Sequence, residues 1–148
     1  MDGLYIIKGI KAKALATPAL TEEIKALINQ AFDKTIEIGH FLWNADTYVM
    51  IRQQSLVALA QIEYVRSKKF WLQHVCTHLD QQRKGYMTAL LKTLMADAKA
   101  RYPRLRKLYL EVHDSRPVAK ALYTKLGFAI KKRARRSTVM IYKYPKVK

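Results

Sequence analysis

The chain has 148 residues and a mass of 17.2 kDa, a length that suits one domain with one hydrophobic core. Half of its residues are apolar and a tenth are aromatic, which excludes a disordered tail. No apolar stretch reaches the roughly 18 residues of a membrane span, and a single cysteine excludes an internal disulfide. We therefore expect one domain over residues 1–148, soluble and cytoplasmic, without a signal peptide or membrane contact.

Charge is distributed unevenly along the chain. There are 28 Lys+Arg against 11 Asp+Glu, a net charge of +17. Residues 1–64 hold 6 basic and 7 acidic side chains, a net of −1, whereas residues 65–148 hold 22 and 4, a net of +18. Such an excess attracts phosphorylated ligands, nucleic acid or acidic protein surfaces. A lysine-rich solvated surface is the alternative interpretation.

The predicted elements of the first half begin with a strand over residues 4–11. A helix follows, capped at Thr17-Pro18 or Thr21, with an apolar stripe at Leu20, Ile24, Leu27, Ile28 and Ala31. Residues 33–46 predict an irregular segment that can hold a short second helix. Strands are predicted over 47–52 and 56–66, as a hairpin around Gln53-Gln54, and over 70–77.

The clearest helix of the second half follows Gly85. Its apolar face consists of Met87, Leu90, Leu91, Leu94, Met95 and Ala98. A strand over 107–113 alternates in polarity. Pro117 suits the first turn of another helix, which Gly127 ends, and its stripe is Ala119, Leu122, Tyr123 and Leu126. Strands over 128–131 and 138–144 can pair, so the order predicts a mixed sheet covered by helices.

The junction between the strand over 70–77 and the helix after Gly85 is the first candidate site. A strand that runs into a helix start exposes unpaired backbone N–H groups, and the helix dipole adds positive charge, so this position suits a phosphate group. Gly85 allows close approach of a ligand, and Arg83 and Lys84 add two cations. An ordinary glycine loop with two surface charges is the alternative.

The segment Val75-Cys76-Thr77-His78-Leu79-Asp80-Gln81-Gln82-Arg83-Lys84-Gly85-Tyr86-Met87-Thr88-Ala89-Leu90-Leu91 resembles motif A of the GCN5-related N-acetyltransferases (GNAT). That family has Gln/Arg-x-x-Gly-x-Gly/Ala between a strand and a helix. Downstream, Leu108-Tyr109-Leu110-Glu111-Val112 and Ala119-x-x-Leu122-Tyr123-x-x-Leu126-Gly127-Phe128 look like the family's second half. The resemblance implies an α+β fold, with a mixed, mostly antiparallel sheet of six or seven strands flanked by about four helices.

The same resemblance implies an enzyme that moves an acetyl group from acetyl-CoA to a primary amine of a peptide, protein or small molecule, directly and without a metal. It assigns acetyl-CoA binding to Val75, Cys76, Thr77, Gln82, Arg83, Lys84, Gly85, Tyr86, Met87, Thr88, Arg116 and Tyr123. Two of these depart from the family pattern. Met87 stands where the family prefers Gly or Ala, and Arg116 stands where many members have Asn. Met87 also fits a core position, so weak cofactor binding or a variant acyl-CoA stays open.

Acetyl transfer requires a neutral amine, donors for the oxyanion and a proton for the leaving thiolate. The family's tyrosine at the position of Tyr123 donates that proton, with a core tyrosine as the alternative. Glu111 is the candidate base, because ribosomal-protein alanine N-acetyltransferases have a glutamate and a tyrosine similarly spaced. We expect it to be half-buried with a raised pKa, or else solvated or ion-paired. Glu63 and His113 are the reserves, and Trp71 stands where histone-acetylating relatives place a glutamate.

The remaining polar residues give weaker signals. His74 and His78 lie roughly 13 Å apart on a strand, too far for one metal ion, and Cys76 is expected to face the core. The densest charge run lies between the last two predicted strands and consists of Lys131, Lys132, Arg133, Arg135 and Arg136. It is either solvated or attracts an acidic or RNA-associated partner. The alternative to an enzyme is thus a non-catalytic GNAT-fold module that binds nucleic acid or a ribosome, and a homodimer is left open.

Overall fold

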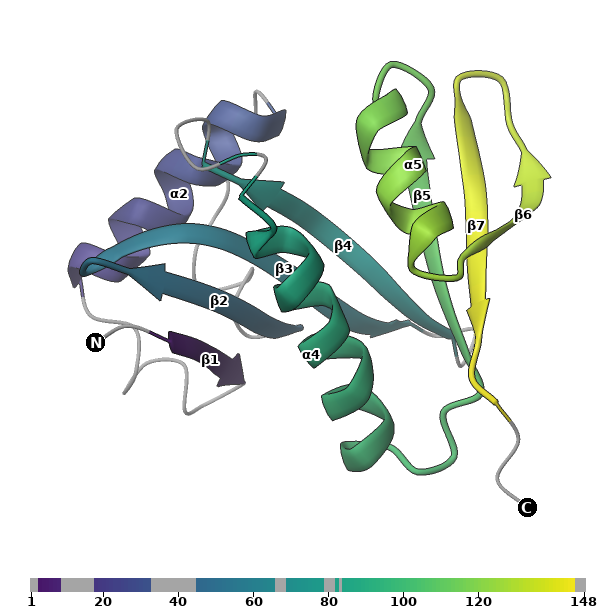
Figure 1. Ribbon diagram of the computed structural model, residues 1–148, viewed down its shortest axis with the longest axis horizontal. Coiled ribbons are helices and arrows are strands. Elements are labelled where there is room, and N and C mark those ends of the chain that lie inside the picture. The colour runs from purple at the N-terminus through teal and green to yellow at the C-terminus, as the bar shows by residue number, and fades with distance from the viewer. Residues whose placement is uncertain are drawn as a thin grey trace.

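The computed structural model describes residues 3–8, 18–32, 45–65, 69–78, 82 and 84–145. The short helix predicted within residues 33–46 falls largely on residues 33–44, which lie outside the described residues, as does Arg83. One seven-stranded sheet organises the described chain, in the order β1-β2-β3-β4-β5-β7-β6 (Figure 1). Among the described residues, no helix is long and apolar enough to cross a membrane.

Neighbouring strands from β1 to β4 pair antiparallel, and among the described strands β4 and β5 form the only parallel pair. The strands are β1 (Gly3–Lys8), β2 (Asp46–Arg52), β3 (Ser55–Val65), β4 (Lys69–Thr77), β5 (Lys107–His113), β6 (Ala129–Arg133) and β7 (Ser137–Lys143). The described helices are α2 (Pro18–Phe32), α4 (Tyr86–Arg101) and α5 (Pro117–Lys125). The predicted mixed, mostly antiparallel sheet is confirmed.

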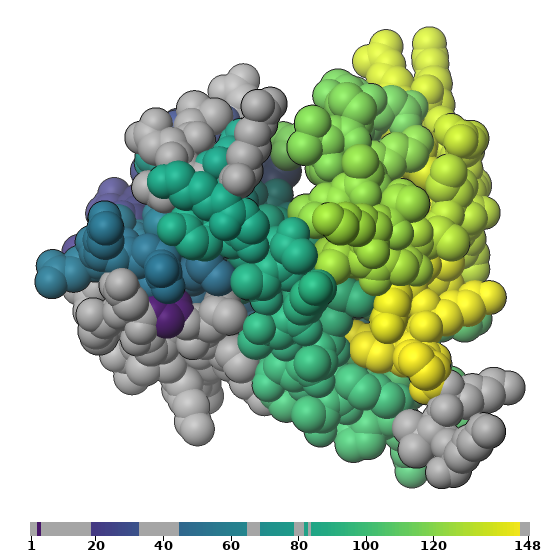
Figure 2. Space-filling view, viewed as in Figure 1, coloured from purple at the N-terminus to yellow at the C-terminus, as the bar shows by residue number. Residues whose placement is uncertain are grey.

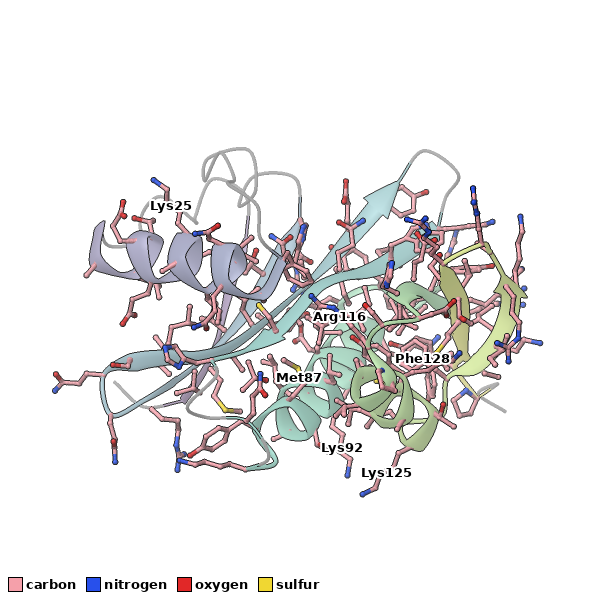
Figure 3. All side chains as sticks on the ribbon, turned by 90° about the horizontal axis from the view of Figure 1, so that it is seen from above. Lys25, Met87, Lys92, Arg116, Lys125 and Phe128 are labelled. Atoms are coloured by element: carbon pink, nitrogen blue, oxygen red, sulfur yellow. The ribbon has the colours of Figure 1, made fainter. Side chains whose placement is uncertain are left out.

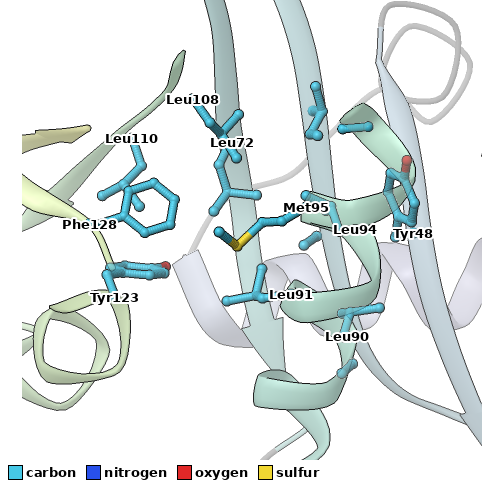
Figure 4. Close-up of a cluster of buried hydrophobic side chains, with 14 of the residues drawn as sticks. Tyr48, Leu72, Leu90, Leu91, Leu94, Met95, Leu108, Leu110, Tyr123 and Phe128 are labelled. Atoms are coloured by element: carbon cyan, nitrogen blue, oxygen red, sulfur yellow. The ribbon is translucent and has the colours of Figure 1, made fainter. Parts of the chain in front are cut away.

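Apolar side chains cover both faces of this sheet. The stripe of α4 is buried as predicted, and it packs with α5 on one face through Leu90, Leu91, Leu94, Met95, Ala98, Leu72, Leu108, Leu110, Tyr123 and Phe128 (Figure 4). On the other face, α2 buries Ile24, Leu27 and Ile28 against β2, β3 and β4. Apolar residues spaced about 3.6 residues apart in the helices and two residues apart in the strands thus form faces that are buried against each other.

Two residues set the ends of α5 as the sequence predicts. Pro117 occupies the first turn, where a missing N–H costs nothing. Gly127 has φ +106°, and the amide of Phe128 returns to the carbonyl of Tyr123 at 3.0 Å. A residue with a Cβ is strained at this φ, so glycine ends the helix here. This end places Tyr123 on the inner side of α5.

The strands β4 and β5 separate along their length. They pair only where Phe70, Trp71 and Leu72 meet Leu108, Tyr109 and Leu110, and beyond this β4 continues toward α2 while β5 continues toward α5 (Figure 1). A bulge bends β4 at the same place, because Gln73 pairs with Gln61 and Cys76 with Leu59. Two residues of β4 therefore oppose one of β3, and the first of them, His74, has φ +51°.

The basic run differs from the prediction. Lys131, Lys132 and Arg133 lie within β6, and only Arg135 and Arg136 belong to the turn before β7. The strand predicted over residues 128–131 covers Ala129–Arg133 instead, and it lies at the edge of the sheet with all five residues exposed. Charged side chains are tolerated on such an edge, where they discourage further strand pairing.

Candidate active site

The separation of β4 and β5 opens a cleft with two cavities. The α4 lobe, of about 590 Å³, is lined by the end of β4, the start of α4 and the first turns of α5. The α2 lobe, of about 530 Å³, is lined by the end of α2, the bulge of β4 and the outer half of β5. Figure 2 shows the molecule hollowed between the β4 and α5 surfaces. The lobes share seven lining residues: Gln30, Ala31, Val75, Ser115, Arg116, Ala119 and Tyr123.

The start of α4 presents unpaired amides to the α4 lobe. The helix ladder begins with the amide of Ala89, which donates to the carbonyl of Gly85 at 3.1 Å, so the amides before it have no partner inside the helix. Gly85 has φ +77°, none of the described side chains caps this end, and the first turn contains no acidic residue. Amides and helix dipole together make this end of the lobe suitable for an anion.

Tyr123 lies where the two lobes meet. Its ring is buried edge-on against Phe128, with ring centroids 5.9 Å apart, and its hydroxyl points away from α5 (Figure 4). Burial raises the pKa of Tyr123 well above its ordinary value, an effect that the nearby Arg116 charge partly opposes. The side chain is therefore a neutral phenol at neutral pH, able to donate a hydrogen bond to a group in the cleft.

Arg116, immediately before α5, spans the cleft. Its guanidinium donates a hydrogen bond to the carbonyl of Ala31 in the last turn of α2 and lies 4.6 Å from the centroid of the Phe32 ring. Cations are favoured at helix C-termini, where carbonyls have no partner inside the helix. Figure 3 shows Arg116 between the layer of α2 and the layer of α4 and α5. The arginine therefore ties α2 to α5 and places positive charge between the lobes.

Glu111 lines the α2 lobe but is exposed, so the expectation of a half-buried carboxylate is wrong. It follows the last residue of β5 that pairs with β4, and the separation of the strands leaves its side chain in solvent. Its carboxylate accepts a hydrogen bond from the Ser137 hydroxyl at 2.6 Å. The predicted alternative, a solvated glutamate, describes it.

The two reserve residues have different positions. Glu63, on β3, pairs with Trp71 of β4 and is not among the described residues that line either lobe. His113 does line the α2 lobe, and its Nδ1 accepts the backbone N–H of Ser115 at 3.1 Å. The neutral ring of His113 therefore has its proton on Nε2. In that form the ring offers no lone pair outside this turn.

The sequence analysis considered His74 only as a metal ligand and missed its position at this cleft. The bulge directs it to the α2 lobe, where its ring packs edge-on against Phe32 at 5.8 Å between centroids. Its Nδ1 lies 3.0 Å from Oε1 of Gln61, whose amide nitrogen donates to Thr47 Oγ1 at 2.8 Å. Gln61 and Thr47 are buried. A carbonyl oxygen only accepts, so Nδ1 donates and Nε2 is the basic nitrogen of neutral His74.

Neither Cys76 nor a metal cluster offers other chemistry among the described residues. Cys76 faces the core beside α2 as predicted, and burial raises the pKa of its thiol to about 12. A thiol with so high a pKa is a poor nucleophile at neutral pH. The described residues contain no group of His, Cys, Asp and Glu that could hold a metal ion.

A sequence model of the acetyltransferase (GNAT) family matches residues 15–128. This chain belongs to the GNAT family. A search of curated proteins finds no match to this GNAT protein. Solved structures share its fold over nearly the whole chain, which agrees with the arrangement of β4, β5 and α4 described above.

Three of these solved structures illustrate the likeness. The ribosomal-protein-S18-alanine N-acetyltransferase from Escherichia coli is 18% identical, with a TM-score of 0.76, and the match covers 100% of this chain and 97% of that one. The IAA acetyltransferase from Bacillus cereus is 20% identical (TM-score 0.74, 96% and 100% covered). The PaiA N-acetyltransferase from Thermoplasma acidophilum, in complex with coenzyme A, is 14% identical (TM-score 0.67, 96% and 99% covered).

The residues that the family resemblance assigned to acetyl-CoA lie together in this GNAT protein, with two exceptions. The α4 lobe is lined by Val75, Cys76, Thr77, Gln82, Gly85, Tyr86, Met87, Thr88, Arg116 and Tyr123. Lys84 is exposed and is not among the lining residues, and Arg83 lies outside the described residues. Met87 does both things expected of it, because it packs against the core and lines the lobe.

Proposed function

We propose that this GNAT protein transfers an acetyl group from acetyl-CoA, bound in the α4 lobe, to a primary amine in the α2 lobe. The observation that carries the proposal is the meeting of the two lobes at Tyr123 and Arg116. Two substrates that enter from opposite sides would meet there, and holding both in place supplies much of the acceleration. Direct transfer needs no covalent enzyme intermediate, in agreement with the inert thiol of Cys76.

The α4 lobe suits acetyl-CoA at its phosphate end. Apart from Gly85 and its two neighbours in the chain, no described residue has an atom within 4 Å of the position that a Cβ on Gly85 would take, so a ligand can approach the backbone there. The amides of the first turn of α4 would bind the pyrophosphate, as helix N-termini do. The bound coenzyme A in the Thermoplasma protein supports this ligand class.

The reaction forms a C–N bond and breaks a C–S bond, and each proton needs a place to go. The amine nitrogen attacks the thioester carbonyl, and amides of β4 near Val75, on the side where β5 no longer pairs, would bind the oxyanion. The Tyr123 phenol would donate a proton to the departing thiolate. Burial raises the pKa of both Tyr123 and Cys76, and the charge of Arg116 partly opposes this effect. Arg116 would therefore add electrostatic stabilisation to the negative charge on the thiolate.

Two groups lining the α2 lobe can accept the proton of the amine, Glu111 and His74. Glu111 is placed as the resemblance to the alanine N-acetyltransferases implies, whereas His74 has the better-oriented basic nitrogen, because Gln61 holds its Nδ1–H. Single variants separate the two. If His74 is the base, His74→Ala slows turnover about 100-fold or more, and added imidazole restores part of it, while Glu111→Gln stays near wild type. The reverse result assigns the role to Glu111.

The acceptor is proposed to be a peptide or protein amine rather than a polycation. The net charge of +17 repels a polyamine at long range. A screen of amines and short peptides that detects the free thiol of CoA would identify the acceptor. The expected result is thiol release with a peptide N-terminus or a lysine and none with spermine.

Isothermal titration with acetyl-CoA is the first test of the proposed function. We expect saturable binding to one site per chain. No heat of binding at millimolar acetyl-CoA would overturn the enzyme proposal and favour the non-catalytic GNAT-fold module that binds nucleic acid or a ribosome through its basic half.

A further inference from the structure

The side of the sheet that holds the α2 lobe extends beyond that lobe, to a surface around Tyr109 that the proposed reaction does not use. On β5, Leu108, Leu110 and Val112 face α4 and α5, so Tyr109 lies on the opposite face. Of the described helices, only α2 lies on that side, and it packs on β2, β3 and β4. A row across this face consists of three residues that pair on adjacent strands: Ile141 on β7, Tyr109 on β5 and Trp71 on β4. The indole of Trp71 is partly exposed, with its centroid 5.3 Å from that of Tyr109.

Lysines frame this aromatic row on both sides. On one side of the row, each of its three strands has a lysine two residues away from the row's member: Lys69, Lys107 and Lys143. Lys131 and Lys132 lie on the other side because β6 has a bulge between Ile130 and Lys132, and this bulge keeps Lys132 opposite Val139. The ammonium groups of Lys69 and Lys131 are 5.0 and 5.3 Å from the Tyr109 ring centroid. We call these seven residues, with Trp71 and Tyr109 in the middle, the lysine–aromatic face.

Within the part of the chain that the structure describes, the lysines of this face have no carboxylate partner. The ion pairs found among the described residues join Lys25 to Glu22 and Arg101 to Asp46 and Asp97. Glu63 and Glu111 lie on the same side of the sheet, and Glu111 is hydrogen-bonded to Ser137. Five lysines against two glutamates leave an excess of positive charge around the partly exposed Trp71, while Tyr109 is buried. An exposed indole within a basic surface attracts a flexible polyanion with flat groups.

We propose that the lysine–aromatic face binds single-stranded RNA, with phosphates on the lysines and a base on Trp71. Stacking on aromatic side chains within a basic surface is how proteins bind single strands without reading sequence, and bases are most accessible in unpaired RNA. Lysine stems are flexible, so the ammonium groups on Tyr109 can move to phosphates. A second copy of the chain fits less well, because a two-fold contact would bring the same five lysines together.

Fluorescence anisotropy with a fluorescein-labelled oligouridine of about 12 nucleotides tests the proposal. The test variant is Lys107→Gln/Lys131→Gln, and the control is Lys92→Gln/Lys125→Gln, which removes the same charge from α4 and α5 on the other side of the molecule (Figure 3). For a single strand, each phosphate contact adds about 0.7 to the salt slope, which is the change in log Kd per unit of log salt concentration. Two lost contacts therefore weaken binding about 25-fold at 0.1 M salt and lower the salt slope by about 1.4. The control should change the Kd less than about threefold.

Trp71→Leu separates stacking from charge. It should weaken RNA binding about tenfold at every salt concentration and leave the salt slope unchanged. Equal losses in the test and control variants would overturn the proposal, as would a poly-glutamate peptide that binds as tightly as the RNA. Analytical ultracentrifugation adds a further outcome: a dimer that Trp71→Leu dissociates, without RNA binding, would assign the face to a second copy. Acetyl-CoA titration of the test variant should match wild type, which keeps this test independent of the proposed reaction.

Discussion

Replacing Gly85 with alanine tests the cofactor turn and its geometry at once. The residue has φ +77°, a conformation that costs an L-residue about 1 to 2 kcal/mol. A Cβ at this position meets no atom of the described residues within 4 Å, its two chain neighbours aside, so no steric clash with them adds to that cost. The stiffer unfolded chain returns about 0.4 to 1 kcal/mol. We therefore expect the free energy of unfolding to fall by about 1 kcal/mol, and Tm by about 3 °C for a chain of this size.

The same substitution should weaken acetyl-CoA binding by much more than it weakens the fold. The new methyl group would occupy space that a phosphate needs to reach the amides of α4, and one lost hydrogen bond to a charged group is worth about 1.5 to 3 kcal/mol. Calorimetry should then give a Kd at least about tenfold higher. Gly85→Asn is the matched control, because asparagine tolerates this φ but still obstructs the ligand. Unchanged affinity in both variants would refute the placement of acetyl-CoA at this turn.

Three further predictions follow from single side chains. Tyr123→Phe keeps the packing on Phe128, so it should leave stability and acetyl-CoA affinity near wild type but lower kcat about 100-fold or more; unchanged turnover would mean that another group protonates the thiolate. Arg116→Asn introduces the family's common residue and removes the contacts with Ala31 and Phe32. It should lower the free energy of unfolding in urea by about 1 to 3 kcal/mol. Equal stability would show that the bridge between α2 and α5 contributes nothing to the stability of the fold. Burial raises the folded-state pKa of Cys76 to about 12 from 9.0, so the unfolded chain loses this proton first as the pH rises. The free energy of unfolding should therefore be constant below pH 9 and fall above it by up to about 1.4 kcal/mol per pH unit. Urea unfolding between pH 8 and 10 should show a shallower decline in Cys76→Ala, and parallel slopes in the two proteins would contradict the buried neutral thiol.

Several features of the fold could be predicted from the sequence because they depend on neighbours along the chain. The helix α4 follows from apolar residues at helical spacing after Gly85, and Pro117 and Gly127 bound α5 through their own backbone preferences. The hairpin of β2 and β3 follows from two strand patterns around Gln53-Gln54, both of which have positive φ. The family resemblance, which depends on the same segments, named ten of the residues that line the α4 lobe.

The chemistry of the α2 lobe depends on contacts between residues far apart in the sequence. The bulge that directs His74 into the lobe exists only in the register of β4 with β3, and the orientation of its ring depends on Gln61 and Thr47. Alternating strand geometry predicts a half-buried Glu111, but the separation of β4 from β5 leaves it exposed.

The sequence by itself determined which segments become the described helices and strands, since spacing, proline and glycine act within a few residues, and it predicted a phosphate site at the start of α4. Only the tertiary structure decided that Arg116 crosses to α2 and that Lys131 and Lys132 share a face with Tyr109. Both depend on which surfaces meet when the sheet assembles. A strand register and an interhelical contact are properties of two segments together, so neither segment encodes them alone.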